Sequence, residues 1–355
     1  MSEDDASLQF FDPNHPLARI GKPVVFSLLI LALVVVYYLG RYAKGAEVLA
    51  TLVRIAPLLI LAMLAVNSAY FVFQGGLLMN VYRTVGFRRT LPYLTAMYLG
   101  MNLVNTIAPV AGLSGSIYMM HFEKKRGLSQ SDTLLINYLY YLTDYTIFLV
   151  VLLVGPLYLL VVGTVTKTVL LTSLVFALFT LAVGIVGVTI FTHPSALHRT
   201  ITFFNHWISR LFLRKRPVIH EEVILRFSEE AKQSWQRSRS SWHYIGYGAL
   251  NSFGLHLSCL LLLWLAFRAF QVPITLQVLV AGYTVATLLN IVSPTPGGIG
   301  IAEGGMTAVF AALGVQVEQA LLVSLLYRTV FIWYPLSLGI AALHILPKLA
   351  ASQPE

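Results

Sequence analysis

The chain has 355 residues, of which 57% are hydrophobic and 11% are charged, and its formal net charge is +9. Soluble globular domains have roughly 45–50% apolar and about 25% charged residues, so this composition excludes a water-soluble fold. We therefore expect an all-α polytopic membrane protein, whose positive charge reports which loops face the cytoplasm rather than a nucleic-acid partner.

The first half of the chain begins with a polar tail, residues 1–22. A spanning helix needs about 20 apolar residues, and the runs 23–40 and 52–73 have that length. The next apolar stretch, 91–120, is interrupted in its middle by proline and glycine. Both residues weaken or break helices, and irregular backbone at membrane depth persists only where protein or a water-filled cavity covers it.

Two further spans, 133–162 and 169–191, complete the first membrane half. Asp144 lies inside the first of them. A bare charge at that depth costs at least ~2.5–3.5 kcal/mol on insertion scales, so Asp144 needs a partner or a cavity.

The segment 192–241 is basic, and Pro217 divides it into two predicted amphipathic helices. Basic amphipathic helices lie on anionic membrane surfaces, so we expect anionic headgroups of the cytoplasmic leaflet as partners. The alternative is a solvated helical hairpin that only sets the topology.

The second membrane half begins with the span 242–269, where His256 either bonds a neighbouring helix or binds a ligand. A second stretch broken by proline and glycine, 275–313, follows it. The last span, 319–346, contains Arg328 and precedes the short tail 347–355.

The distribution of Lys and Arg sets the predicted topology. Basic residues gather in 192–241 and around Arg88 and Lys125, so these segments are expected in the cytoplasm together with both termini. Both flanks of 91–120 are then cytoplasmic, and thirty residues do not easily cross about 30 Å twice at 1.5 Å per residue. We expect about six full spans and two re-entrant hairpins, 91–120 from inside and 275–313 from outside, although 275–313 also fits two thin crossings. The predicted organisation is a tail (1–22), a first membrane half (23–191), a cytoplasmic helical hairpin (192–241), a second membrane half (242–346) and a tail (347–355).

The two broken stretches share one spacing, at an offset of 185 residues. The matching positions are Asn105, Pro109, Gly112 and Gly115 in the first stretch, and Asn290, Pro294, Gly297 and Gly300 in the second. Their opposite predicted orientations indicate an inverted-topology repeat, as in many transporters. The alternative is that glycine and proline are simply common in membrane helices.

Asp144 and Arg328 each follow one of these hairpins at a similar distance. One hypothesis is that they face each other or a shared cavity. In the alternative, each satisfies local backbone or lies nearer an interface.

The segment Pro296, Gly297, Gly298 and Gly300 leads into a predicted helix, 301–313. A helix N-terminus carries roughly half a positive charge and attracts anions, so a phosphate headgroup is the expected ligand. Glu303 lies in the first turn, either as a helix-start acid or as a group that carries a proton or binds an amine. The candidate substrate-binding residues are Asn105, Pro109, Gly112, Gly115, Asn290, Pro294, Pro296, Gly297, Gly298, Gly300 and Glu303.

The run Pro296-Gly297-Gly298-x-Gly300-x-x-Glu303 resembles the transmembrane, flippase-like region of lysylphosphatidylglycerol synthases and related stand-alone membrane proteins. The resemblance covers about 20–346 and implies movement of a modified lipid between leaflets. Two differences leave a lysyl-lipid substrate open. The synthases continue after the membrane region with a soluble aminoacyl-transfer domain, and this sequence reaches Glu355 without one. In addition, Ser114, Ser116 and Tyr118 stand where family members often have an acid and an arginine.

These features favour a lipid transporter of the plasma membrane over an enzyme. We find no phosphate-binding loop, no His-Glu-x-x-His run and no cysteine pair, so we expect no catalytic residues, metal or cofactor. One alternative is a membrane-embedded transferase, for which Glu303 or Asp144 would have to serve as the base. The other is a non-transporting partner of a lipid-modifying enzyme.

Overall fold

The computed structural model describes residues 55–107, 113–124, 126–162, 167–193, 195, 198–200, 202, 221–292, 298 and 300–353. Every regular element in these residues is a helix, which confirms the all-α fold predicted from composition. The predicted tail 1–22 and span 23–40 lie outside the described residues.

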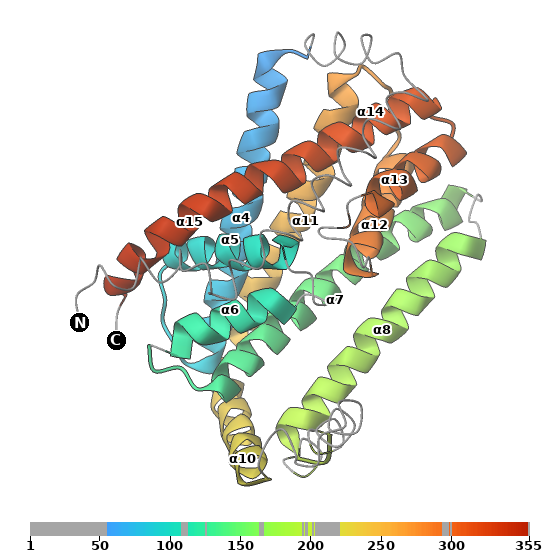
Figure 1. Ribbon diagram of the computed structural model, residues 1–355. Coiled ribbons are helices and arrows are strands. Elements are labelled where there is room, and N and C mark those ends of the chain that lie inside the picture. Colours follow the sequence, from blue (N-terminus) through green and yellow to red (C-terminus); the bar gives the residue numbers. More distant parts are fainter. Residues whose placement is uncertain are drawn as a thin grey trace, which may run out of the picture. The chain divides into compact units, whose positions relative to one another are not determined.

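Five helices form the described first half of the chain (Figure 1). They are α4 (Pro57–Val85), α5 (Leu91–Ile107), α6 (Leu113–Lys124), α7 (Gln130–Val162) and α8 (Lys167–Thr192). The helix α4 continues well beyond the predicted end at residue 73, and Arg83 lies in its last turn. It stops where Gly86 adopts φ 101° and the amide of Phe87 bonds the carbonyl of Tyr82 (2.9 Å), a glycine-dependent helix end.

The second half continues with α10 (Glu221–Ser238), the 3-10 turn η3 (Arg239–Ser241), α11 (His243–Ala269), α12 (Leu276–Val292), α13 (Ile301–Ala312), α14 (Val317–Arg328), the π-helical turn η5 (Thr329–Trp333) and α15 (Tyr334–Ala351). Figure 1 shows α14 running on into α15, so the predicted span 319–346 is one helix with a π-helical turn in it. Pro335 explains that turn, because it has no amide hydrogen for the carbonyl of Phe331. Such π turns recur at functional sites, and this one follows Arg328 directly.

Four helices in the described residues are long and apolar enough to cross a membrane: Pro57–Val85, Gln130–Leu153, His243–Ala269 and Val317–Ala351. Their surfaces agree with a lipid environment. Leu58, Leu250 and Leu257 are large, apolar and exposed, and α8 exposes a further row that includes Leu181 and Ile185. Together with the composition, these surfaces make the chain an integral membrane protein.

The chain divides into two compact units. The described part of the first comprises 55–68, 99–107, 113–115 and 259–292, with 298 and 300–342. Its helices α12, α13 and α14 pack in succession, and Phe267 of α11 meets Phe310 of α13 edge to face at 4.9 Å. Close packing also places Gly282 of α12 directly against the ring of Phe310, where a side chain would not fit.

The second unit comprises the described residues of 69–98, 116–258 and 343–355. Here α7 packs against α8 and α10. In α4, Gly75 lies against the backbone of Thr95 in α5, so a side chain at that position would separate the two helices. The rings of Phe191 and Trp235 stack at 6.0 Å and join α8 to α10.

Candidate functional site

The second broken stretch forms two helices, α12 and α13, that pack closely on each other. The chain between them contains Gly298 and Gly300, whose φ angles of 69° and 85° belong to the left-handed region. Side chains rarely adopt that region, so the glycines permit the sharp reversal. The predicted break is therefore confirmed.

The N-terminus of α13 is closed by its own acid. The amide of Gly300 donates to Oε2 of Glu303 (2.7 Å), and the first helical bond runs from Gly304 to the carbonyl of Gly300 (3.1 Å). Glu303 thus has the helix-start role that was one of its two predicted interpretations.

Arg328 is the second partner of Glu303. Its Nε–H donates to Oε1 of Glu303 at 3.0 Å, and the two residues are only 4% and 7% exposed. The structure therefore joins two residues that sequence reasoning placed in separate hypotheses. A buried ion pair inside an apolar helical unit is costly to desolvate, which makes Glu303 and Arg328 candidates for a functional site.

Asn290 and Arg328 both reach the break itself. A Cβ atom built on Gly298 would lie 3.0 Å from Oδ1 of Asn290 and 3.5 Å from Nη2 of Arg328. Asn290 is exposed, whereas Arg328 and Glu303 are buried. The backbone of Gly298 therefore lies next to the exposed side-chain amide of Asn290 on one hand and to the buried Arg328 on the other.

The first broken stretch is likewise divided between two described helices, α5 and α6. Oδ1 of Asn105 accepts a hydrogen bond from the amide of Gly115 across the break (2.6 Å). Here an amide side chain holds the two arms together.

Five of the predicted substrate-binding residues lie outside the described residues: Pro109, Gly112, Pro294, Pro296 and Gly297. Their predicted roles and the inverted orientation of the two hairpins stay predictions.

Asp144 has partners within the second unit. Oγ of Ser252 donates to its Oδ1 (2.9 Å), and Nε2 of His256 lies 3.4 Å from the same oxygen. Arg328 bonds Glu303 in the first unit. The predicted meeting of Asp144 with Arg328 stays a prediction.

Sequence reasoning missed a buried acid at the end of the first hairpin. Glu123 is 0% exposed, and it accepts a hydrogen bond from Tyr93 (2.7 Å) while Nη2 of Arg89 lies 3.5 Å away. The one sequence signal for this site is that Glu123 is a single acid directly before Lys124 and Lys125. Such a charged run is typical of a loop, so the sequence did not indicate that Glu123 is buried.

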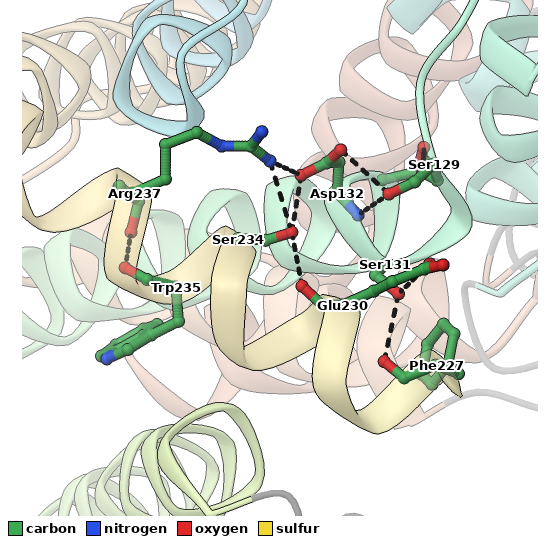
Figure 2. Close-up of polar contacts among 10 residues, drawn as sticks. Ser129, Ser131, Asp132, Phe227, Glu230, Ser234, Trp235 and Arg237 are labelled. Atoms are coloured by element: carbon green, nitrogen blue, oxygen red, sulfur yellow. Dashed lines mark hydrogen bonds and ion pairs between the residues drawn. The ribbon is translucent and has the colours of Figure 1, made fainter. Parts of the chain in front are cut away.

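The helix α10 docks on the start of α7, as Figure 2 shows. Oδ1 of Asp132 accepts hydrogen bonds from Ser234 (2.7 Å) and from Nη2 of Arg237 (2.5 Å). The other oxygen of Asp132 accepts from Ser129, whose hydroxyl in turn accepts from the Asp132 amide (3.0 Å). The buried face of α10, which includes Ala231 and Trp235, therefore packs on protein. Contact of the basic face with anionic lipid stays a prediction.

Within the part of the chain that the structure describes, no three His, Cys, Asp or Glu side chains gather as metal ligands would. The polar centres of the described residues include a charge pair at a helix break and a carboxylate–imidazole pair between α7 and α11.

The fold and these buried charges define a polytopic α-helical membrane protein with broken helices. The chain matches the family described as the lysylphosphatidylglycerol synthase TM region over residues 24–339, and it belongs to that family. It is also similar to a protein described as a UPF0104 membrane protein from Methanothermobacter thermautotrophicus, with 26% identity over 140 residues. That similarity covers 39% of this chain and 38% of the relative.

Proposed function

We propose that this protein moves an anionic or lipid-linked lipid between the leaflets of the plasma membrane, with both termini in the cytoplasm. The candidate headgroups are aminoacyl-phosphatidylglycerol, glycolipids and polyprenyl-phosphate sugars. The family to which the chain belongs is named after lysylphosphatidylglycerol synthases. This name supports a phospholipid, or its aminoacyl ester, as the transported lipid.

The observation that carries the proposal is the donor set around Glu303. Its carboxylate rests on the amide of Gly300, at a helix N-terminus, and on the guanidinium of Arg328. Backbone amides at a helix start combined with an arginine are donors that bind phosphate. Glu303 therefore occupies a place that suits an anionic headgroup.

A transport step follows from this arrangement. An entering phosphate replaces the Glu303 carboxylate at Arg328, and Glu303 then binds a proton so that no bare carboxylate is left at membrane depth. When the headgroup leaves, Glu303 loses this proton and takes both donors back. Arg328 is never left unpaired in either state, which avoids the cost of a bare charge at membrane depth. The exposed amide of Asn290 marks the side from which the headgroup reaches Gly298.

The test uses a double variant that keeps the helix start intact. Glu303→Gln retains an oxygen for the Gly300 amide, and Arg328→Met removes the anion donor without leaving an unpaired charge. The purified protein is placed in phosphatidylcholine liposomes with headgroup-labelled phosphatidylglycerol, and an external quencher reports how fast label changes leaflet. A hydrogen bond to a charged group contributes about 1.5–3 kcal/mol, so we expect translocation to slow by about 10- to 100-fold.

The matched control is Arg268→Met, since Arg268 is exposed at the end of α11 and stacks over Trp264. This control should translocate at the parental rate. A folded double variant that moves phosphatidylglycerol as fast as the parent contradicts the proposal. Formation of a covalent lipid product by the purified protein would instead favour the transferase.

A further inference from the structure

A second buried polar centre lies between α7 and α11 and is not used in the proposed transport step. Nε2 of His256 lies 3.4 Å from Oδ1 of Asp144 and 3.3 Å from its backbone carbonyl. Ser252 donates to the same carboxylate oxygen at 2.9 Å. The side chain of His256 is 4% exposed and that of Asp144 is 17% exposed.

Both residues lie within helices that are long and apolar enough to span the membrane, Gln130–Leu153 and His243–Ala269. Without a bound proton the pair carries one negative charge, and with one proton it is neutral overall. A net charge at membrane depth is costly, whereas histidine changes its charge between about pH 5 and 8. The short distance between the imidazole and the carboxylate makes the two side chains a candidate place for one shared proton.

Several tyrosines lie near the pair in the described part of the chain. Tyr98 of α5 and Tyr140 and Tyr145 of α7 are electrostatic neighbours of Asp144. The ring of Tyr141 lies 5.1 Å from that of Tyr140 and 5.9 Å from that of Tyr145. These hydroxyls are neutral near pH 7, so they do not replace the histidine as counter-charge for Asp144.

The other packed elements contribute polar or aromatic groups. Tyr140 donates to Gln74 of α4, and Gln74 donates to Tyr70 (2.8 Å). The ring of Phe148 lies 5.5 Å from that of His256. The helix α8 contributes the ring of Phe179 beside Tyr145 at 6.3 Å. The charges that α10 brings to α7 meet Asp132, near the start of that helix.

We propose that Asp144 and His256 form a proton-binding site that couples lipid movement to a proton gradient. The coupling rests on the proposed function, whereas proton binding does not. Asp144 is partly exposed within a helix that is long and apolar enough to span the membrane, and a proton would reach the pair from this exposed side. If a proton binds to Asp144 and His256 in alternation with an anionic headgroup at Arg328, the movement of protons is linked to the movement of lipid.

The coupling test measures a steady state, because a merely structural role changes rates and not the final distribution. Liposomes with headgroup-labelled phosphatidylglycerol receive a gradient of about one pH unit, while potassium and valinomycin clamp the membrane potential. One pH unit is a tenfold proton ratio, so coupling of one proton per lipid predicts up to about tenfold leaflet asymmetry of the label. A proton ionophore should abolish it.

Asp144→Asn and His256→Gln should still translocate lipid but leave the label evenly distributed. Two variants are used so that a folding failure of one leaves the other to decide. The matched control is Asp132→Asn, an acid on the same helix, which should keep the full asymmetry. Parental protein that translocates label yet distributes it evenly under the gradient overturns the coupling.

A lipid-free measurement separates this inference from the proposed function. Infrared difference spectra of the purified protein between about pH 5 and 8 should contain carboxyl or imidazolium bands that disappear in both Asp144→Asn and His256→Gln. If no labelled lipid moves but these bands are present, the proposed function fails and the proton site stands. If the bands are unchanged in both folded variants, the proton site is overturned.

Discussion

The two broken hairpins share an asparagine contact but are closed by different chemistry. In each, an asparagine of the first helix reaches a glycine at the start of, or just before, the second helix. The second hairpin has its charge pair, Glu303–Arg328, at the break, whereas the charged contact of the first hairpin, Arg89–Glu123, lies at the ends of its helices that are far from the break. The positions 185 residues earlier hold Tyr118 and Thr143.

From this difference we infer that the shared Asn, Pro and Gly spacing determines where the helices are interrupted. Residues outside that spacing determine what the break binds. The neutral closure by Asn105 needs no ligand to balance a charge. The charged closure has an anionic side chain that a headgroup can replace. We therefore expect lipid selectivity to depend on the second hairpin.

The largest effect should come from breaking the charge pair. Arg328→Met leaves Glu303 as a buried unpaired charge, which costs about 3–5 kcal/mol of stability. The double variant with Glu303→Gln should regain most of that loss, because no bare charge remains. Equilibrium unfolding of the purified protein in detergent measures both. Losses that simply add in the double variant would show that the pair contributes nothing through mutual contact.

The glycines of the two breaks should respond to substitution for different reasons. Gly300 has φ 85° and open space around it, so Gly300→Ala introduces backbone strain of about 1–2 kcal/mol. A Cβ on Gly115 would lie 2.8 Å from the carbonyl oxygen of Met101, so Gly115→Ala introduces a clash of about 1–3 kcal/mol.

Side-chain size distinguishes the two cases. Backbone strain at Gly300 arises with any side chain and the space around it is open, so Gly300→Leu should unfold near the temperature of Gly300→Ala. At Gly115 a larger side chain worsens the clash, so Gly115→Leu should be less stable than Gly115→Ala. Thermal melts of the four variants provide the measurement. A much lower melting temperature of Gly300→Leu than of Gly300→Ala would argue against strain as the cause.

The sequence predicted the helical class and both helix breaks, because apolar length and proline or glycine act locally. It did not predict the Glu303–Arg328 pair, because the two residues lie on different helices and their contact depends on how α13 packs on α14. Glu123 was missed for a related reason. Its burial depends on Tyr93 and Arg89, and the local sequence is typical of a basic loop.

The smallest effect should come from the neutral closure of the first hairpin. Asn105→Ala removes the acceptor of the Gly115 amide, a neutral hydrogen bond that contributes about 0.5–1.5 kcal/mol. A Cβ on Gly115 would also lie 2.6 Å from Nδ2 of Asn105. Asn105→Ala should therefore relieve part of the cost of Gly115→Ala, and unfolding of the double variant should show less than the summed loss.

The same variant sharpens the functional contrast between the hairpins. Asn105→Ala should change the translocation of labelled phosphatidylglycerol and phosphatidylcholine by similar factors, since the Asn105–Gly115 contact that it removes is neutral and does not recognise charge. The Arg328→Met and Glu303→Gln double variant should lose its preference for phosphatidylglycerol, because the arginine that recognises phosphate charge is gone. Competition between the two labelled lipids in one liposome population measures the ratio directly. Loss of anion preference in Asn105→Ala alone would assign selectivity to the first hairpin and reverse the comparison.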